Sequence, residues 1–308
     1  MINFRYHIVS LMAVFLALSV GIVLGVTLRG PVDEGLTAQA EQDRRQVQEL
    51  RTELDRRDAI DDYRDAYALR GGKVLTQDLL AQRRVAIVAM PDAPTPVVNA
   101  IDTAVTDAGG VVTHTVRVNA DAFDTEKTVA TLKVLDAFGG QLQLTEAMTP
   151  ATKLGTALGR AVFAKDASER DQLAADLSTA LTRGGLVAID GRSTQEAELA
   201  IVVTAEATEQ RPTREALDAH LQMDVALKTQ ARGVVLAGPN SADIEGTDVL
   251  TARTDSSADE LLSTVDVADL PSGVTTTILA GLEQLLGRQG HYGALARADA
   301  PLPQLPVR

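Results

Sequence analysis

The spacing of hydrophobic positions divides the chain into parts with different periodicities. Residues 8–28 form an apolar run without a charged side chain, and residues 32–70 are polar, with apolar residues three, four or seven positions apart. Residues 74–293 alternate short apolar runs with segments of helical periodicity. These patterns predict a transmembrane helix, a coiled-coil stalk and an α/β globular domain. A short cytoplasmic N-terminus at residues 1–7 and a disordered tail at 294–308 complete the expected organisation.

The apolar run is long enough to cross a bilayer. Its about 21 residues would rise about 30 Å as a helix, which is the thickness of the hydrocarbon core. The alternative is a cleaved signal peptide, whose apolar region is usually about 7–15 residues and ends at a small-x-small site. The run ends instead in Val26-Thr27-Leu28-Arg29. We therefore expect an uncleaved, single-pass anchor in membrane lipid, with the long C-terminal part outside the cytoplasm.

One face of the predicted anchor carries only small side chains. They recur at every fourth position, as Ala13, Ala17, Gly21 and Gly25. Small residues at this spacing let two membrane helices approach each other closely. Glycine and alanine are also common in membrane helices generally, so composition alone is the alternative explanation. We interpret this stripe as a dimerisation face because the next segment also has the pattern of a helix that pairs with another helix.

The polar segment that follows predicts a helix that pairs with another helix. Its apolar seam consists of Leu36, Ala40, Val47, Leu50 and Leu54, and it resumes in a shifted register at Ile60, Tyr63 and Tyr67. Arg57 and Asp61 occupy the seam positions between the two stretches, as at a stutter in a coiled coil. So narrow a stripe favours a homodimer over burial in a globular core. An exposed single helix, or a stalk folded back on the domain, is the alternative, and Gly71-Gly72 is expected to end the stalk.

The third part is typical of a doubly wound, mostly parallel sheet of the α/β class. A continuous apolar run, as a buried parallel strand has, stands at 85–89, and another buried strand is expected at 233–238. Further strands are expected at 186–190 and 198–204, and a more alternating one at 111–118. Helices are expected at 74–82, 95–108, 120–138, 150–164, 167–183, 213–231 and 271–286. Residues 247–251 are expected to form the last strand. Alternating strands and helices imply crossover connections, and hence parallel neighbours.

Composition narrows the possible partners. The net charge of −13 argues against nucleic acid, which is bound through basic surfaces. The chain contains no cysteine, which is compatible with export but is also common in bacterial proteins of any compartment. With 45% hydrophobic residues, the part outside the anchor can bury a sizeable core.

Motifs for catalysis are missing from the sequence. It contains no P-loop, no G-x-S-x-G and no H-E-x-x-H, and Met90-Pro91-Asp92 follows the first strand where a dinucleotide-binding glycine loop would stand. We therefore expect a non-enzymatic protein. Polar residues after predicted strands could line a small ligand cleft, namely Asp92, Asp190, Arg192 and Asn240. We favour the simpler interpretation of these residues as turn and cap formers; an enzyme acting on an envelope ligand there is the alternative.

Metal ligands also show no pattern. The histidines, His7, His114, His220 and His291, are far apart in the sequence. Thiolate and thioether ligands select Cu(I), but the chain has neither cysteine nor a Met-x-x-Met pattern. We expect no resident metal and no cofactor. His291 stands in Gly290-His291-Tyr292-Gly293, where a packing role is more common than metal ligation.

Two blocks of sequence resemble a known family. Residues 2–11 (INFRYHIVSL), followed by 17–25 (ALSVGIVLG), and residues 287–293 (GRQGHYG) resemble the actinobacterial copper transport protein B, or MctB, family. The order of parts and the length are similar too. The resemblance implies an envelope protein in copper efflux and homeostasis. Its SteB branch implies instead a scaffold that acts with a SteA-like membrane partner in cell separation, upstream of septal peptidoglycan hydrolysis.

A copper transporter and a cell-separation scaffold need different membrane structures, so the hydrophobic pattern helps to distinguish the two roles. A transporter normally has several spanning helices, whereas this chain offers one apolar helix. A pore would need several copies of that helix. The pattern favours a dimeric stalk that presents an α/β domain to a partner, while the resemblance implies copper transport.

Overall fold

The computed structural model describes residues 4–124, 127–166, 169–208, 211–239 and 245–304. The chain divides into two units, residues 1–63 and residues 64–308, and we call the second unit the head. Helix α1 (Phe4–Thr76) contributes to both units. Residues 64–76 of this helix belong to the head, and we call them the α1 end.

The predicted anchor and stalk are parts of one helix. Its backbone is helical through Pro31 and continues through Gly71 and Gly72 to Thr76. The expected stalk end at Gly71-Gly72 and the expected separate helix at 74–82 are therefore wrong. Glycine weakens a helix by about 1 kcal/mol relative to alanine without forbidding it. At Gly72 the missing side chain has a purpose, because a β-carbon there would lie 2.1 Å from Thr275 Oγ1 in helix α10 (Pro271–Leu285).

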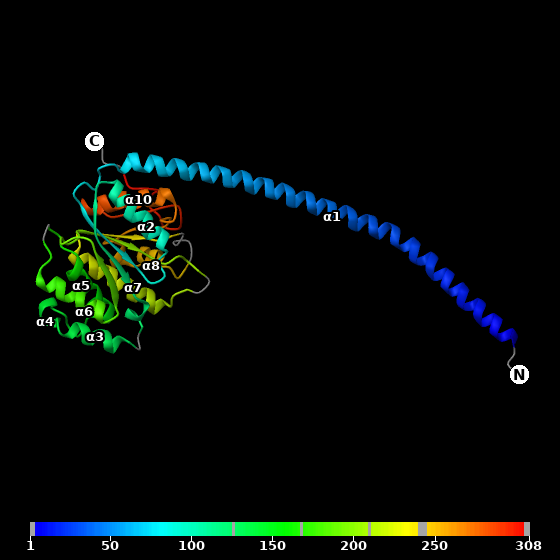
Figure 1. Ribbon diagram of the computed structural model, residues 1–308, viewed down its shortest axis with the longest axis horizontal. Helices are drawn as coiled ribbons and strands as arrows, with labels where there is room; N and C mark the ends of the chain where they lie inside the picture. The colour runs from blue at the N-terminus through cyan, green and yellow to red at the C-terminus, as the bar shows by residue number, and fades with distance from the viewer. Residues whose placement is uncertain (1–3, 125–126, 167–168, 209–210, 240–244, 305–308) are drawn as a thin grey trace. The chain divides into compact units, whose positions relative to one another are not determined.

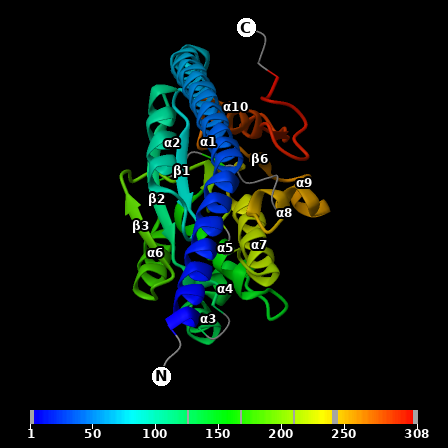
Figure 2. The same ribbon diagram turned by 90° about the vertical axis from the view of Figure 1, so that its right-hand side faces the viewer.

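The head is built on a seven-stranded sheet in the order β3-β2-β1-β4-β5-β6-β7. The strands are β1 (Arg84–Ala89), β2 (Val111–Val118), β3 (Val187–Gly191), β4 (Leu199–Val203), β5 (Gly233–Ala237), β6 (Ser263–Val265) and β7 (His291–Tyr292). All neighbours pair in parallel except β2 and β3, which are antiparallel. In Figure 2, β3 lies at one side of the head and β6 at the other. The predicted α/β fold with a mostly parallel sheet is thus confirmed.

Helices cover both faces of this sheet (Figure 1). They are α2 (Thr95–Asp107), α3 (Thr128–Asp136), α4 (Gly139–Leu142), α5 (Pro150–Val162), α6 (Gln172–Arg183), α7 (Arg214–Gln230), α8 (Asp248–Thr254), α9 (Ser256–Asp259) and α10, with a 3-10 turn η1 (Ala120–Ala122). Strands β1, β4 and β5 are buried along their whole length, so each one feeds a core on both faces. On one face α5, α6 and α7 pack, and on the other α2 and α10.

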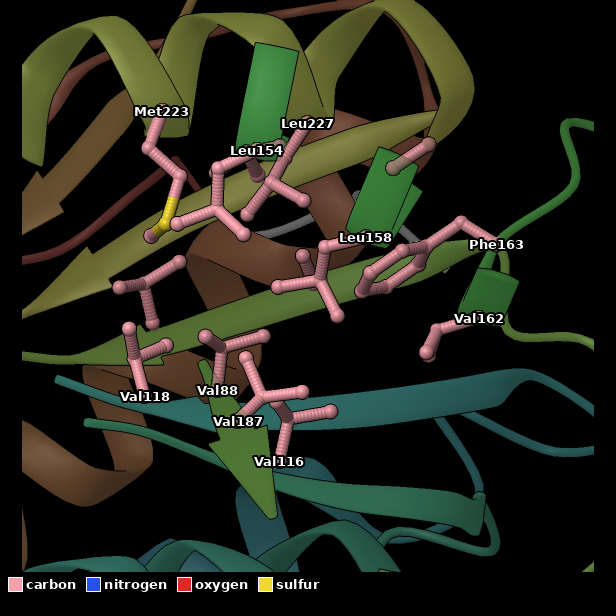
Figure 3. Packing of buried hydrophobic residues seen from close by; sticks show 14 of the residues in the cluster. Val88, Val116, Val118, Leu154, Leu158, Val162, Phe163, Val187, Met223 and Leu227 are labelled. Carbon is pink, nitrogen blue, oxygen red and sulfur yellow. The ribbon is translucent and has the colours of Figure 1, made fainter. Parts of the chain in front are cut away.

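The larger core lies under α5 and α7. Figure 3 shows Leu154 and Leu158 of α5, with Met223 and Leu227 of α7, directed toward Val88 and its neighbours on the sheet. These leucines and Met223 are fully buried. With almost no aromatic residues available, the core is formed by the packing of branched aliphatic side chains.

Two segments differ from the prediction at the C-terminal side of the head. The strand expected at 247–251 is wrong: these residues enter α8, because the side chain of Thr247 accepts a hydrogen bond from the Leu250 N–H and so caps a helix. Residues 294–304, expected as part of a disordered tail, are held in place. The amides of Ala294 and Leu295 donate to Asp266, and Ala300 bridges to Tyr292.

Earlier in the chain, the helix expected at 120–138 is divided into η1 and α3.

The crossing of α5 and α7 depends on a glycine. A β-carbon at Gly155 would lie 2.4 Å from the carbonyl oxygen of Met223 and 2.8 Å from the β-carbon of Ala226. We predict that Gly155→Ala lowers the free energy of unfolding by about 1–3 kcal/mol, because both neighbours are backbone or short side chain and cannot move aside. Denaturant titration followed by circular dichroism measures the loss. The control is Gly140→Ala, because a β-carbon at position 140 would meet no atom within 4 Å and should not destabilise the protein. Gly185 would not serve as a control, because its positive φ strains any other residue.

Candidate functional site

The polar residues that could line a cleft at the strand ends are not all brought together. Asp92 follows β1 and is exposed in a turn, with a φ of 61°. Asp190 pairs with Thr115 within the β2–β3 ladder, and the Arg192 amide donates to Thr113, toward the opposite ends of β1 and β2. The reason is the antiparallel direction of β3, which carries its own carboxyl end away from that of β1. Arg192 pairs with Asp102 of α2, Nη1 to Oδ2 at 2.6 Å, and also with Asp190, Nε to Oδ2 at 3.7 Å. Asn240 lies outside the described residues.

A buried ion pair lies at the other side of the sheet. Arg253 of α8 and Asp266, which follows β6, have no exposed side-chain surface, and their Nη1 and Oδ2 atoms are 2.8 Å apart. The arginine also donates to Thr264 Oγ1 and to the carbonyl oxygens of Tyr292 and Ala296. Burial lowers the pKa of Arg253 and the Asp266 carboxylate opposes that shift. One guanidinium thus joins α8, β6, β7 and the C-terminal segment.

The Gly-His-Tyr-Gly block that carries the family resemblance is part of this network. His291 and Tyr292 form β7, and both are buried. A β-carbon at Gly293, where φ is 136°, would lie 2.0 Å from Asp266 Oδ1, so only glycine fits beside that carboxylate. The Tyr292 hydroxyl donates to Glu283 of α10; burial, and then this contact, raises the tyrosine pKa. The expected packing role of His291 agrees with this placement.

The hydrogen bonds through His291 run in one direction. Its Nε2 lies 2.8 Å from Asp259 Oδ1, and a carboxylate only accepts, so Nε2 carries the hydrogen. Its Nδ1 lies 2.9 Å from Thr264 Oγ1. This hydroxyl donates to Nδ1, and its oxygen accepts a hydrogen bond from Arg253 Nε. This hydroxyl, histidine and carboxylate are arranged as in a catalytic triad. The hydroxyl of Thr264 is fully buried and already engaged, however, so the arrangement ties strands together and offers no nucleophile.

A second buried polar cluster joins α7 and α8. His220 Nδ1 lies 2.8 Å from Asp248 Oδ1, and the His220 ring packs edge-on against Phe123. Asp224, one turn further along α7, is 1% exposed, and within the described part of the chain neither of its oxygens has a hydrogen-bond partner. Burial, and then the charge of Asp248, raises the pKa of Asp224 well above its ordinary value. Burial at this position therefore favours the neutral form of the carboxyl.

The remaining described histidines do not extend this cluster. His114 in β2 is fully buried, and burial followed by the charge of Arg170 lowers its pKa to about 4. It is therefore neutral at physiological pH. Within the described ranges, no three His, Asp or Glu side chains are placed to hold a metal ion together.

The residues expected to pair the helices are on the surface of α1. Ala13 and Ala17 are exposed, and a β-carbon at Gly21 or Gly25 would meet no atom within 4 Å. The hydroxyls of Ser19 and Thr27 bond to carbonyls of the preceding turn, so that the helix presents an apolar surface. His7–Thr27 is a candidate membrane span of 21 residues with a mean hydropathy of 2.6.

The stalk seam is exposed as well. Val47, Leu50 and Leu54 are 47%, 57% and 56% exposed, although apolar side chains normally seek cover. Ala40, Tyr63 and Tyr67 are exposed and Ile60 is half-buried, while the side chain of Leu36 lies outside the described ones. Tyr67 belongs to the head, in the α1 end, whereas the earlier seam positions belong to the first unit.

Sequence reasoning missed Arg253, Asp266 and Asp224. For Asp224 a signal exists: it stands between Leu221 and Leu227 at a core position of an amphipathic helix, where a charged residue is out of place. Arg253 and Asp266 offer no such signal, because the residues that they contact include ones far away in the sequence.

Comparison with known proteins extends this description over the whole chain. Residues 1–303 match the family described as copper transport outer membrane protein, MctB. The chain is similar to copper transporter MctB of Mycobacterium tuberculosis strain H37Rv, at 30% identity over 316 residues, covering 95% of this chain and 96% of the relative. The Mycobacterium bovis counterpart has the same identity and coverage, and the Mycobacterium leprae counterpart is 29% identical.

Proposed function

The chain belongs to the MctB family of copper transport outer membrane proteins, and on this premise we propose that it serves copper transport as a non-enzymatic, dimeric envelope protein. A single helix anchors each copy, the following turns pair as a stalk, and the head binds a partner. The copper path is formed by several copies or by that partner. The protein itself supplies the anchor and the docking surface.

The observation that carries this proposal is the structure of α1. One helix contains an apolar span of 21 residues and, beyond it, an exposed apolar seam. The span fits the thickness of a bilayer. The seam side chains gain about 25 cal/mol for each Å² that a second helix covers. Ala13, Ala17, Gly21 and Gly25 give the span a face for close approach.

The proposed topology places the N-terminus inside and the head outside. A long folded part of the chain, the head, follows the span. Long domains after a single anchor are translocated largely regardless of their charge. This orientation gives the head access to envelope partners.

The test of the copper role is total cell copper after a copper challenge, in a deletion strain and in strains complemented with variants. We expect copper to rise in the deletion strain and to return to normal with the wild-type gene. The triple variant Val47→Asp, Leu50→Asp, Leu54→Asp should fail to restore it, because it places like charges along the seam. Ala59→Asp, an exposed position on the opposite face, should restore it. Unchanged copper in the deletion strain would exclude the copper role.

A second candidate function is a scaffold for cell separation that acts with a SteA-like membrane partner. The feature that favours it is the long helix joining a membrane span to a folded head, which is suited to holding a partner at the membrane. Cell separation is scored in the same cultures. Chained cells with normal copper would favour the scaffold, whereas high copper with normal separation would exclude it.

A further inference from the structure

An apolar groove lies beside the α1 end, entirely within the head. Its volume is about 520 Å³. One wall is formed by Ala68, Gly71 and Leu75 of α1, and the other includes Leu270, Leu279 and Leu302. Leu75, Leu270 and Leu302 are 36%, 39% and 41% exposed. The groove therefore keeps large apolar side chains in contact with water, which is the property of a surface that another molecule covers.

The two glycines of the α1 end differ in what they contact. Gly72 meets α10, where a β-carbon would collide with Thr275. Gly71 lines the groove, and a β-carbon there would meet no atom of the described chain within 4 Å. Glycine inside a helix costs about 1 kcal/mol relative to alanine. Contacts within the head do not account for that cost at Gly71, but close approach by a second backbone would.

The register of α1 identifies what enters the groove. Val47, Leu54, Ala68 and Leu75 are separated by seven residues or by multiples of seven, and Leu50 stands in the same heptad position as Gly71. By sequence register, the α1 residues of the groove wall thus occupy the same heptad positions as the stalk seam. Tyr67 of the shifted stripe lines the groove too. We infer that the groove receives the α1 end of a second copy of this chain, an inference that rests on the proposed stalk dimer.

Cross-linking tests this inference, because the chain has no cysteine of its own. Single variants Leu50→Cys, Ala68→Cys and Leu75→Cys are made in the full-length protein in membranes, with Ala59→Cys and Ala66→Cys as controls on the opposite face. A short bis-maleimide is the probe. We expect dimers at the three seam positions, at least tenfold more abundant than at the controls. Dimers at Leu50→Cys without dimers at the two groove positions would overturn the inference and leave the stalk dimer standing. Dimers at none of the three would overturn both.

A bulky residue at Gly71 provides an independent measurement. A β-carbon at position 71 meets no atom of the described chain within 4 Å, and leucine favours a helix more than glycine does, so the head with Gly71→Leu should still fold. In a Leu75→Cys background it should reduce the cross-linked dimer at least tenfold, because it fills the place of the second backbone. The same change in a Leu50→Cys background should leave the stalk dimer. An undiminished dimer at Leu75→Cys would show that no second helix approaches Gly71.

Discussion

Replacing Arg253 by Met should lower the free energy of unfolding of the head by about 3–5 kcal/mol. Removing one partner of a buried pair leaves the other charge uncompensated, and such losses fall in this range. Here the Asp266 carboxylate would lose its only described cation contact while remaining fully buried. The carbonyls of Tyr292 and Ala296 and the hydroxyl of Thr264 would lose donors too. Denaturation of the detergent-solubilised full-length protein, followed by circular dichroism, measures the loss.

The control for this prediction is Arg214→Met, an exposed arginine at the start of α7, which should change stability by less than about 0.5 kcal/mol. The double variant Arg253→Met, Asp266→Leu should be less destabilised than the sum of the two single changes, because it leaves no lone buried charge. If Arg253→Met were as stable as the control, the pair would not hold the C-terminal segment. Protease cleavage after residue 293 should rise in parallel with the loss of stability.

Replacing Asp224 by Leu should have the opposite effect, a gain of about 2–4 kcal/mol at pH 7. The two carboxyl oxygens are buried without hydrogen-bond partners in the described chain, and orphaned buried polar atoms cost about 1–3 kcal/mol each. Leucine has a similar size and adds apolar contacts between α7 and α8. Asp218→Leu, exposed on the same helix, is the matched control and should have little effect.

The pH dependence supplies a second measurement for Asp224. Its pKa is raised in the folded protein by burial and by Asp248. Between the ordinary aspartate pKa and this raised pKa, the folded state therefore holds a proton that the unfolded chain releases. Stability from this group is complete below the ordinary aspartate pKa and is lost as the pH rises through the raised folded pKa. The gain from Asp224→Leu should therefore grow with pH in this window. A gain independent of pH would mean that Asp224 ionises normally in the folded protein.

The buried centre of the sheet is predictable from the sequence. β1, β4 and β5 appear as short, largely apolar runs because both of their faces are covered. The helices α5 and α7 are predictable from their amphipathic spacing and from Thr149 and Thr213, whose side chains cap them. The membrane span is predictable because bilayer thickness fixes its length.

The edges of the sheet are not predictable in this way. β6 and β7 contain three and two residues, too few to show any periodicity, and their pairing is decided by contacts with distant segments. The direction of β3 is equally hidden, because strand direction depends on the path of the preceding helices. This direction separates Asp190 and Arg192 from Asp92, so these three residues do not line one cleft.

The sequence by itself therefore determined the candidate membrane span, the polar helix with its apolar seam, the α/β class and the family. Each depends on local periodicity or on contiguous residues. Only the tertiary structure decided that Arg253 and Asp266 meet, that Asp224 has no described partner, and that Gly71 and Leu75 face an apolar groove. These features arise from residues far apart in the chain, and their free energies depend on burial, which no local pattern encodes.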